Sequence, residues 1–114
     1  MKKIEAVIPH DRLKKASTEL LQFPIGGFTY YETKGRGQIP TPVIHTGRGT
    51  SVYRPEFNVN IMISVVVPDN LVADIVNKII DSTSSGLAGE GKVFVSDVDE
   101  AVDIGSGSRG ESAL

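Results

Sequence analysis

The fold is indicated by residues 58–80, NVNIMISVVVPDNLVADIVNKII, which place a strand pattern directly before a helix pattern. From Val59 to Val67 every second residue is apolar, the period of two expected of a strand with one face on a core. Pro68 ends that pattern, and Asp69 is a candidate N-cap for the following helix. The helix should pack on a sheet, because its apolar residues form a wide stripe at helical spacing: Leu71, Val72, Ile75, Val76, Ile79 and Ile80.

The first part of the chain repeats this order of elements. Residues 3–8 alternate as a strand, Asp11 is a candidate N-cap, and Leu13, Ala16 and Leu20 share one helical stripe. Residues 28–33 and 92–96 carry the aromatic and β-branched residues typical of strands. The order β-α-β, long loop, β-α-β predicts an α+β fold, a ferredoxin-like βαββαβ sandwich with two helices on one face of an antiparallel sheet.

The connection between the second and third predicted strands spans about residues 36–57. It contains several glycines and prolines and shows no periodicity of a helix or strand. A connection of that length without regular structure usually has a function. A second segment, about residues 105–114, is expected to be a flexible tail, and the chain is expected to form a single domain over residues 1–114.

Composition narrows the class of function. The chain has 114 residues, a formal charge of −2 and no cysteine. Its charge gives no broad basic surface for nucleic acid, and the absence of cysteine fits a reducing compartment. No apolar stretch is long enough to span or insert into a membrane. We therefore expect a cytoplasmic protein that binds no nucleic acid.

The most distinctive motif is the run from Gly86 to Lys92, which fits the first seven positions of the phosphate-binding G-x-x-x-x-G-K pattern. Val93 stands where Mg²⁺ would require Ser or Thr, and the segment leads from a helix into a strand. Nucleotide hydrolysis is therefore not expected. Backbone amides of glycines with a lysine still suit phosphate binding, although a plain turn with a solvated lysine explains the same pattern.

No residues suggest catalysis or a metal site. His10 and His45 are the only histidines and lie in different segments. A zinc site needs three or four converging ligands, and no nucleophile stands in a recognisable setting.

Four segments resemble the PII family of signal-transduction proteins. Met1–Ile8 is similar to the family's opening strand, and Val65–Asp69 to its third strand and helix start. Gly89–Val95 is similar to its G-D-G-K-I-F-V segment, and Arg109–Leu114 to its closing segment. The resemblance implies a homotrimer that binds adenine nucleotide between subunits, often with 2-oxoglutarate, and that docks a long T-loop on a transporter, enzyme or regulator.

The resemblance also assigns roles to residues. Tyr53 matches a tyrosine that some members carry modified. Arg48, Tyr53 and Arg54 are the expected partner contacts of the T-loop for a separate reason, because Tyr and Arg are over-represented at interface hot spots, although solvent exposure alone would also explain all three. An ammonium transporter or a metabolic enzyme is the kind of target implied. The nucleotide contacts implied are Val7, Thr29, Gly35, Arg36, Gly37, Gln38, Val66, Gly89, Glu90, Gly91 and Lys92.

The chain departs from the family at several of these positions. Asp103 and Gly105 stand where family members carry two phosphate-binding arginines, which favours ADP or AMP over ATP. Ile39 stands at or beside the place of a glutamine that helps to hold Mg²⁺ and 2-oxoglutarate, with Gln38 one residue earlier as an alternative to it. Asn60 replaces a lysine that pairs with the 2-oxoglutarate carboxylate, and these changes weigh against sensing of 2-oxoglutarate with Mg²⁺. Two hypotheses stay open: a trimeric regulator switched by a nucleotide or related small effector, and an interaction protein of the same fold without ligand control.

Overall fold

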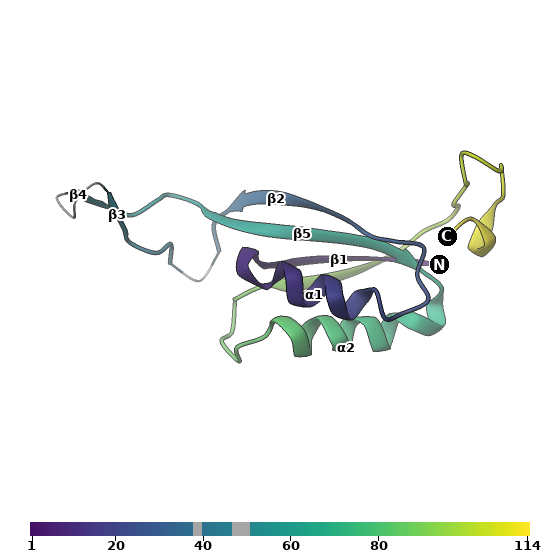
Figure 1. Ribbon diagram of the computed structural model, residues 1–114, viewed down its shortest axis with the longest axis horizontal. Coiled ribbons are helices and arrows are strands. Elements are labelled where there is room, and N and C mark those ends of the chain that lie inside the picture. Colours follow the sequence, from purple (N-terminus) through teal and green to yellow (C-terminus); the bar gives the residue numbers. More distant parts are fainter. Residues whose placement is uncertain (38–39, 47–50) are drawn as a thin grey trace.

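The main sheet has four antiparallel strands in the order β2-β5-β1-β6. The computed structural model describes residues 1–37, 40–46 and 51–114, and only the backbone of residues 44–46, 51 and 53. The strands are β1 (Lys2–Pro9), β2 (Thr29–Gly35), β5 (Asn58–Val67) and β6 (Lys92–Asp97), and the helices are α1 (Leu13–Leu20) and α2 (Val72–Thr83). This element order and sheet order confirm the predicted ferredoxin-like fold (Figure 1).

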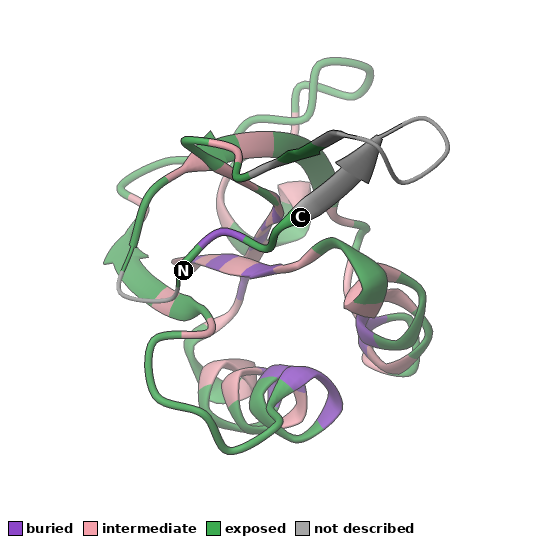
Figure 2. Ribbon diagram, turned by 90° about the vertical axis from the view of Figure 1, so that its left-hand side faces the viewer, coloured by how far each residue is buried: buried purple, intermediate pink, exposed green. Residues whose placement is uncertain are grey.

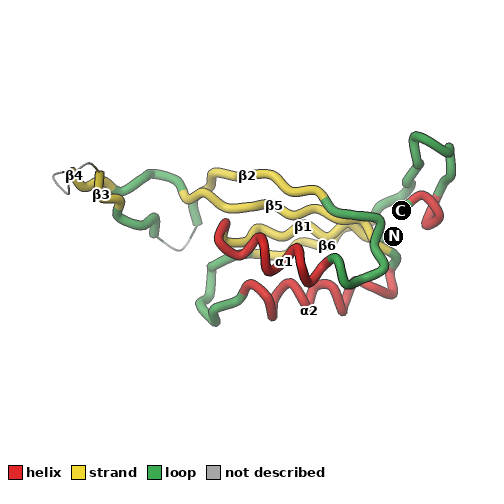
Figure 3. The backbone as a smooth tube through the Cα atoms, viewed as in Figure 1, coloured by secondary structure: helices red, strands yellow, loops and turns green. Residues whose placement is uncertain are grey.

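Both helices lie on the same face of the sheet (Figure 3). The core forms between them and the sheet, because the inward residues of β1 and β5 alternate as the sequence predicts (Figure 2). Ala16 and Leu20 of α1 and Ile75 and Ile79 of α2 complete it from the helix side. The buried strand residues are Ile4, Ala6, Ile8, Ile61, Ile63, Val65 and Val67.

The two helices begin in the same way, and the predicted side-chain caps are wrong at both. Short 3₁₀ turns, His10–Arg12 and Asp69–Leu71, follow Pro9 and Pro68, and no side chain caps either turn or helix. A proline fixes the extended entry of the chain, and the 3₁₀ turn leads into the α-helix without an N-cap bond.

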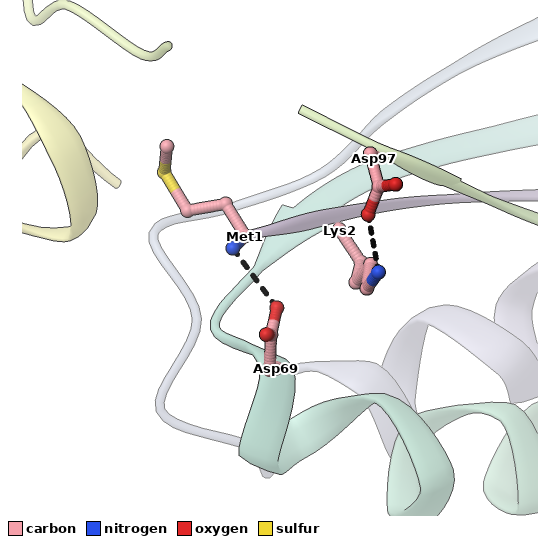
Figure 4. A network of polar contacts seen from close by, with 4 residues as sticks. All are labelled: Met1, Lys2, Asp69 and Asp97. Atoms are coloured by element: carbon pink, nitrogen blue, oxygen red, sulfur yellow. Dashed lines mark hydrogen bonds and ion pairs between the residues drawn. The ribbon is translucent and has the colours of Figure 1, made fainter. Parts of the chain in front are cut away.

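Asp69 has another partner. Its carboxylate lies 2.9 Å from the amino group of Met1, beside the ion pair of Lys2 with Asp97 (Figure 4). The hydrogen bond from that amino group lowers the pKa of the Asp69 carboxyl. The Lys2–Asp97 pair lies at one end of the β1–β6 ladder, and the Met1–Asp69 pair joins that end to the start of the second helical segment.

The long loop contains regular structure that the sequence did not predict. Strands β3 (Ile44–Thr46) and β4 (Ser51–Tyr53) pair antiparallel and extend away from the main sheet (Figure 1). This projection explains the radius of gyration of 17.1 Å, against about 13 Å for a compact domain of similar length. The loop is thus an arm that carries a short two-stranded sheet.

The C-terminal segment also differs from the flexible tail expected. Val102 forms a bridge with Arg109, and Gly110–Ala113 is a 3₁₀ turn. The backbone of Leu114 packs on Gly26 so closely that a Cβ there would lie 2.6 Å from the Leu114 carbonyl carbon. The segment therefore folds back on the loop after α1.

No helix in the described part of the chain has the length and apolar character needed to cross a membrane.

Candidate functional site

A cavity of about 240 Å³ opens where the turn after α2 meets the end of β1. Val7 and Pro9 line it from β1, and Ile80 and Thr83 from α2. The third wall is the turn from Leu87 to Val93, which holds the glycine and lysine motif. The cavity thus has apolar walls on two sides and backbone amides with one lysine on the third.

Two glycines of the turn are required by its geometry. Gly89 has φ +86°, a conformation that a side chain disfavours. Gly91 lies against β1, where a Cβ would stand 2.4 Å from the Val7 carbonyl oxygen. The two glycines therefore hold the backbone of the turn close to β1. Phosphate binding by such a turn also requires accessible backbone amides, which residues without a side chain favour.

Lys92 directs a positive charge to the same place. It is exposed and pairs in register with Val7, on the sheet face that the helices leave uncovered. Its ammonium forms no ion pair with the described residues. The charge is therefore available to an anion.

Glu90 has a local structural role in addition to lining the cavity. Its carboxylate accepts hydrogen bonds from the backbone N–H of Ser85, at 2.7 Å, and from the Ser85 hydroxyl. These bonds lower the pKa of the carboxyl and hold the two ends of the turn together. The family resemblance implies that Glu90 contacts nucleotide, whereas its carboxylate here faces its own turn.

Thr29 and Val66 lie on the same uncovered sheet face but away from the turn. Thr29 is opposite Ser64 in the ladder and Val66 is opposite Lys3, whereas Val7 is opposite Met62. Val66 is four residues along β5 from Met62, or about 13 Å at the rise of a strand. One chain therefore does not bring these two residues to the cavity.

The base of the long loop forms a second cavity of about 360 Å³. Arg36, Gly37 and Thr41 line it from one limb, and Arg54 and Glu56 from the other. Gly35 ends β2 just before it. Gln38 and Arg48 lie outside the described residues, as does the side chain of Tyr53.

The C-terminal segment, which carries Asp103 and Gly105, lies beyond the end of the main sheet that is remote from the turn after α2 (Figure 1). The Asp103 carboxylate accepts the N–H of Ser106 at 2.8 Å, which lowers the pKa of that carboxyl. Arg109 pairs with Glu100. Within one chain, Asp103 thus supports its own turn and does not approach the cavity.

Sequence reasoning missed two groups of residues. Ile79, Ile80 and Thr83 line the first cavity from the end of α2. The apolar stripe that contains Ile79 and Ile80 predicted packing on the core and gave no indication of a cavity. Thr41 is buried in the middle of the long loop, where no periodicity marks it. The structure shows no cluster of three or more potential metal ligands among the residues it describes.

Comparison with known proteins identifies the family. The profile of the nitrogen regulatory protein P-II family matches residues 1–108. The nitrogen regulatory protein P-II of Haemophilus influenzae is 36% identical over 116 aligned residues, and P-II 1 of Escherichia coli is 35% identical, each comparison covering both chains in full. The chain belongs to the nitrogen regulatory P-II family.

A solved P-II structure agrees with the fold. The structure of Arabidopsis thaliana PII bound to citrate matches with a TM-score of 0.77 and 27% identity, covering 99% of this chain and 91% of that one. The protein is therefore a PII-like signalling protein.

Proposed function

We propose that this P-II protein binds an adenine nucleotide or a related small effector in clefts between the subunits of a homotrimer. It then regulates a target protein, such as an ammonium transporter or a metabolic enzyme, through the T-loop. The observation that supports effector binding best is the cavity in which Gly91 packs against Val7, beside a Lys92 that forms no ion pair with the described residues. Close backbone amides and one cation are what a bound phosphate needs.

The placement of Thr29 and Val66 supports a cleft between subunits. Both residues lie on the uncovered sheet face, remote from the cavity of their own chain. A site that uses both groups requires a second chain to supply one of them. Such a contact would also cover the exposed face of the sheet.

We infer that ADP or AMP binds ahead of ATP. The segment that carries two arginines in other family members here presents Asp103, whose carboxylate is engaged in its own turn, and Gly105. A charge-assisted contact commonly contributes about 1.5–3 kcal/mol. ATP has the longest phosphate chain, so its binding free energy should be reduced most when two such contacts are missing.

A ligand-independent interaction protein is the alternative, and the same C-terminal segment favours it. Isothermal titration calorimetry with ATP, ADP, AMP, cyclic nucleotides and 2-oxoglutarate, with and without Mg²⁺, separates the two functions. Binding of ADP or AMP tighter than ATP supports the proposal. No heat with any of these compounds would favour the alternative, and tightest binding of MgATP with 2-oxoglutarate would contradict the proposed preference.

A further inference from the structure

The neck of the T-loop lies between two separate strand ladders. The main-sheet ladder of β2 with β5 ends at the pair Gly35 and Asn58, and the ladder of β3 with β4 begins at Ile44 and Tyr53. The limbs that join them are unequal, residues 36–43 against residues 54–57. A single continuous ladder therefore cannot run from the sheet to the hairpin.

Prolines stop the outer ladder from growing toward the sheet. If the register of Ile44 with Tyr53 continued by two residues, Pro42 would stand opposite Pro55. Neither proline has an N–H to donate, so no backbone hydrogen bond can form at that pair. The outer hairpin needs another connection between its limbs at this point.

Two side chains supply that connection. The Thr41 hydroxyl donates to the Pro55 carbonyl oxygen, and the Arg54 guanidinium donates to the Thr41 carbonyl oxygen at 2.9 Å. Thr41 is only 7% exposed, although it lies in the arm and far from the core. Each of the two residues precedes a proline, which favours an extended backbone there and reduces the entropy lost when the limbs join.

We propose that Thr41 and Arg54 form a latch that fixes the direction of the β3–β4 hairpin relative to the main sheet. The latch replaces missing backbone donors with side-chain donors, so it opens without breaking a strand ladder. Its opening releases the hairpin to change direction while the sheet and its core stay intact. The latch consists only of contacts within the T-loop, so it does not require the proposed nucleotide.

The test measures the direction of the hairpin by double electron–electron resonance. The chain has no cysteine, so Val52→Cys on β4 and Asn77→Cys on α2 place two spin labels at exposed positions without a background thiol. Labelled chain is mixed with a large excess of unlabelled chain, so that each oligomer carries one labelled copy. Distances then report a single subunit.

Two substitutions open the latch and two serve as controls. Thr41→Val keeps the shape and removes the hydroxyl donor, and Arg54→Met keeps the length and removes the guanidinium. Thr41→Ser retains a hydroxyl and should preserve the latch. Arg36→Met removes the other arginine of the same cavity, which makes no hydrogen bond or ion pair with the described residues.

The parent and both controls should give a narrow distance distribution. Thr41→Val and Arg54→Met should each broaden it, because losing one net hydrogen bond changes the closed-to-open ratio on the order of fivefold. Thermal unfolding followed by circular dichroism should be unchanged in all variants, since the latch lies outside the core. A parent distribution as broad as those of the variants would overturn the proposal, as would equal broadening by Arg36→Met.

Discussion

Gly91 shows how a single residue joins the fold to the site. Its α-carbon faces the Val7 carbonyl so closely that no side chain fits. The same contact keeps the glycine turn at the end of β1, where Lys92 follows directly. The sequence motif indicated phosphate chemistry, but the reason for this glycine is visible only when β1 and β6 are paired.

We predict that Gly91→Ala destabilises the protein by about 1–3 kcal/mol, the usual effect of forcing a methyl group into packed structure. It should also abolish the proposed nucleotide binding, because the turn must move away from β1. Urea unfolding and calorimetric titration measure the two effects. Gly105→Ala is the matched control, since a Cβ at that position would lie 3.4 Å from the Asp103 carboxylate oxygen, which is at the edge of ordinary contact. Equal stability of the two variants would mean that the turn relaxes without strain.

A second prediction concerns the Glu90 carboxylate. Its hydrogen bonds with Ser85 lower its pKa from the usual value of 4.5. Because the pKa of the folded state is lowered, the stabilisation of the turn is present above pH 4.5 and is lost as the pH falls through the lowered value. The amide signal of Ser85, followed by NMR, should titrate in that acidic range.

Glu90→Gln is the control for this titration. The amide still accepts hydrogen bonds but does not ionise, so the Ser85 signal should no longer move with pH. A Ser85 titration at or above the ordinary glutamate range would show that the carboxylate does not accept the bond.

At the scale of elements, the parts that alternate regularly were predicted well. β1, β5 and both helices each bury one face, and that burial is the origin of the pattern read from the sequence. The hairpin was missed because β3 and β4 have three residues each, too few for an alternation to be recognised. Their β-branched residues Ile44, Thr46 and Val52 were the only signal.

The hairpin should act as the output element of the protein. We predict that deleting residues 44–52 leaves the fold and the oligomer intact, because every residue of the main core lies in β1, α1, β5 or α2. Capture of target protein should be lost. Circular dichroism, light scattering and pull-down with purified candidate targets measure the three properties.

The control for this deletion is a substitution in the core. Ile63→Ala should destabilise by about 2–5 kcal/mol and leave the T-loop unchanged, so that target capture persists at temperatures where the variant is folded. Capture that survives the deletion would exclude the hairpin as the target contact, and loss of the oligomer would show that it has a structural role.

At the scale of the whole molecule, the sequence predicted one layer of helices on one face of a sheet, and the structure has that arrangement (Figure 3). The candidate site was less predictable, because Val7 and Lys92 meet in one chain while Thr29 and Val66 lie elsewhere on the open face. The periodicity of a single sequence does not indicate which surfaces of two copies of the chain contact each other. The T-loop neck was equally hidden, because Thr41 and Arg54 lie on different limbs of the loop and only the fold brings them into contact.

The open face leads to the last prediction, that the protein is a trimer in solution. Val7, Met62 and Val66 are half-buried there and Phe94 is 54% exposed, with no helix above them. Val66→Glu should dissociate the trimer, because burying an unpaired carboxylate in an interface is unfavourable by several kcal/mol. Val59→Glu is the control: the residue is on the same strand but, by alternation, on the opposite face, and it is 42% exposed. Size-exclusion chromatography with light scattering should give three copies for the parent and for Val59→Glu, and smaller species for Val66→Glu. A parent that is a stable monomer at micromolar concentration would contradict this prediction, and with it the proposal that effectors bind between subunits.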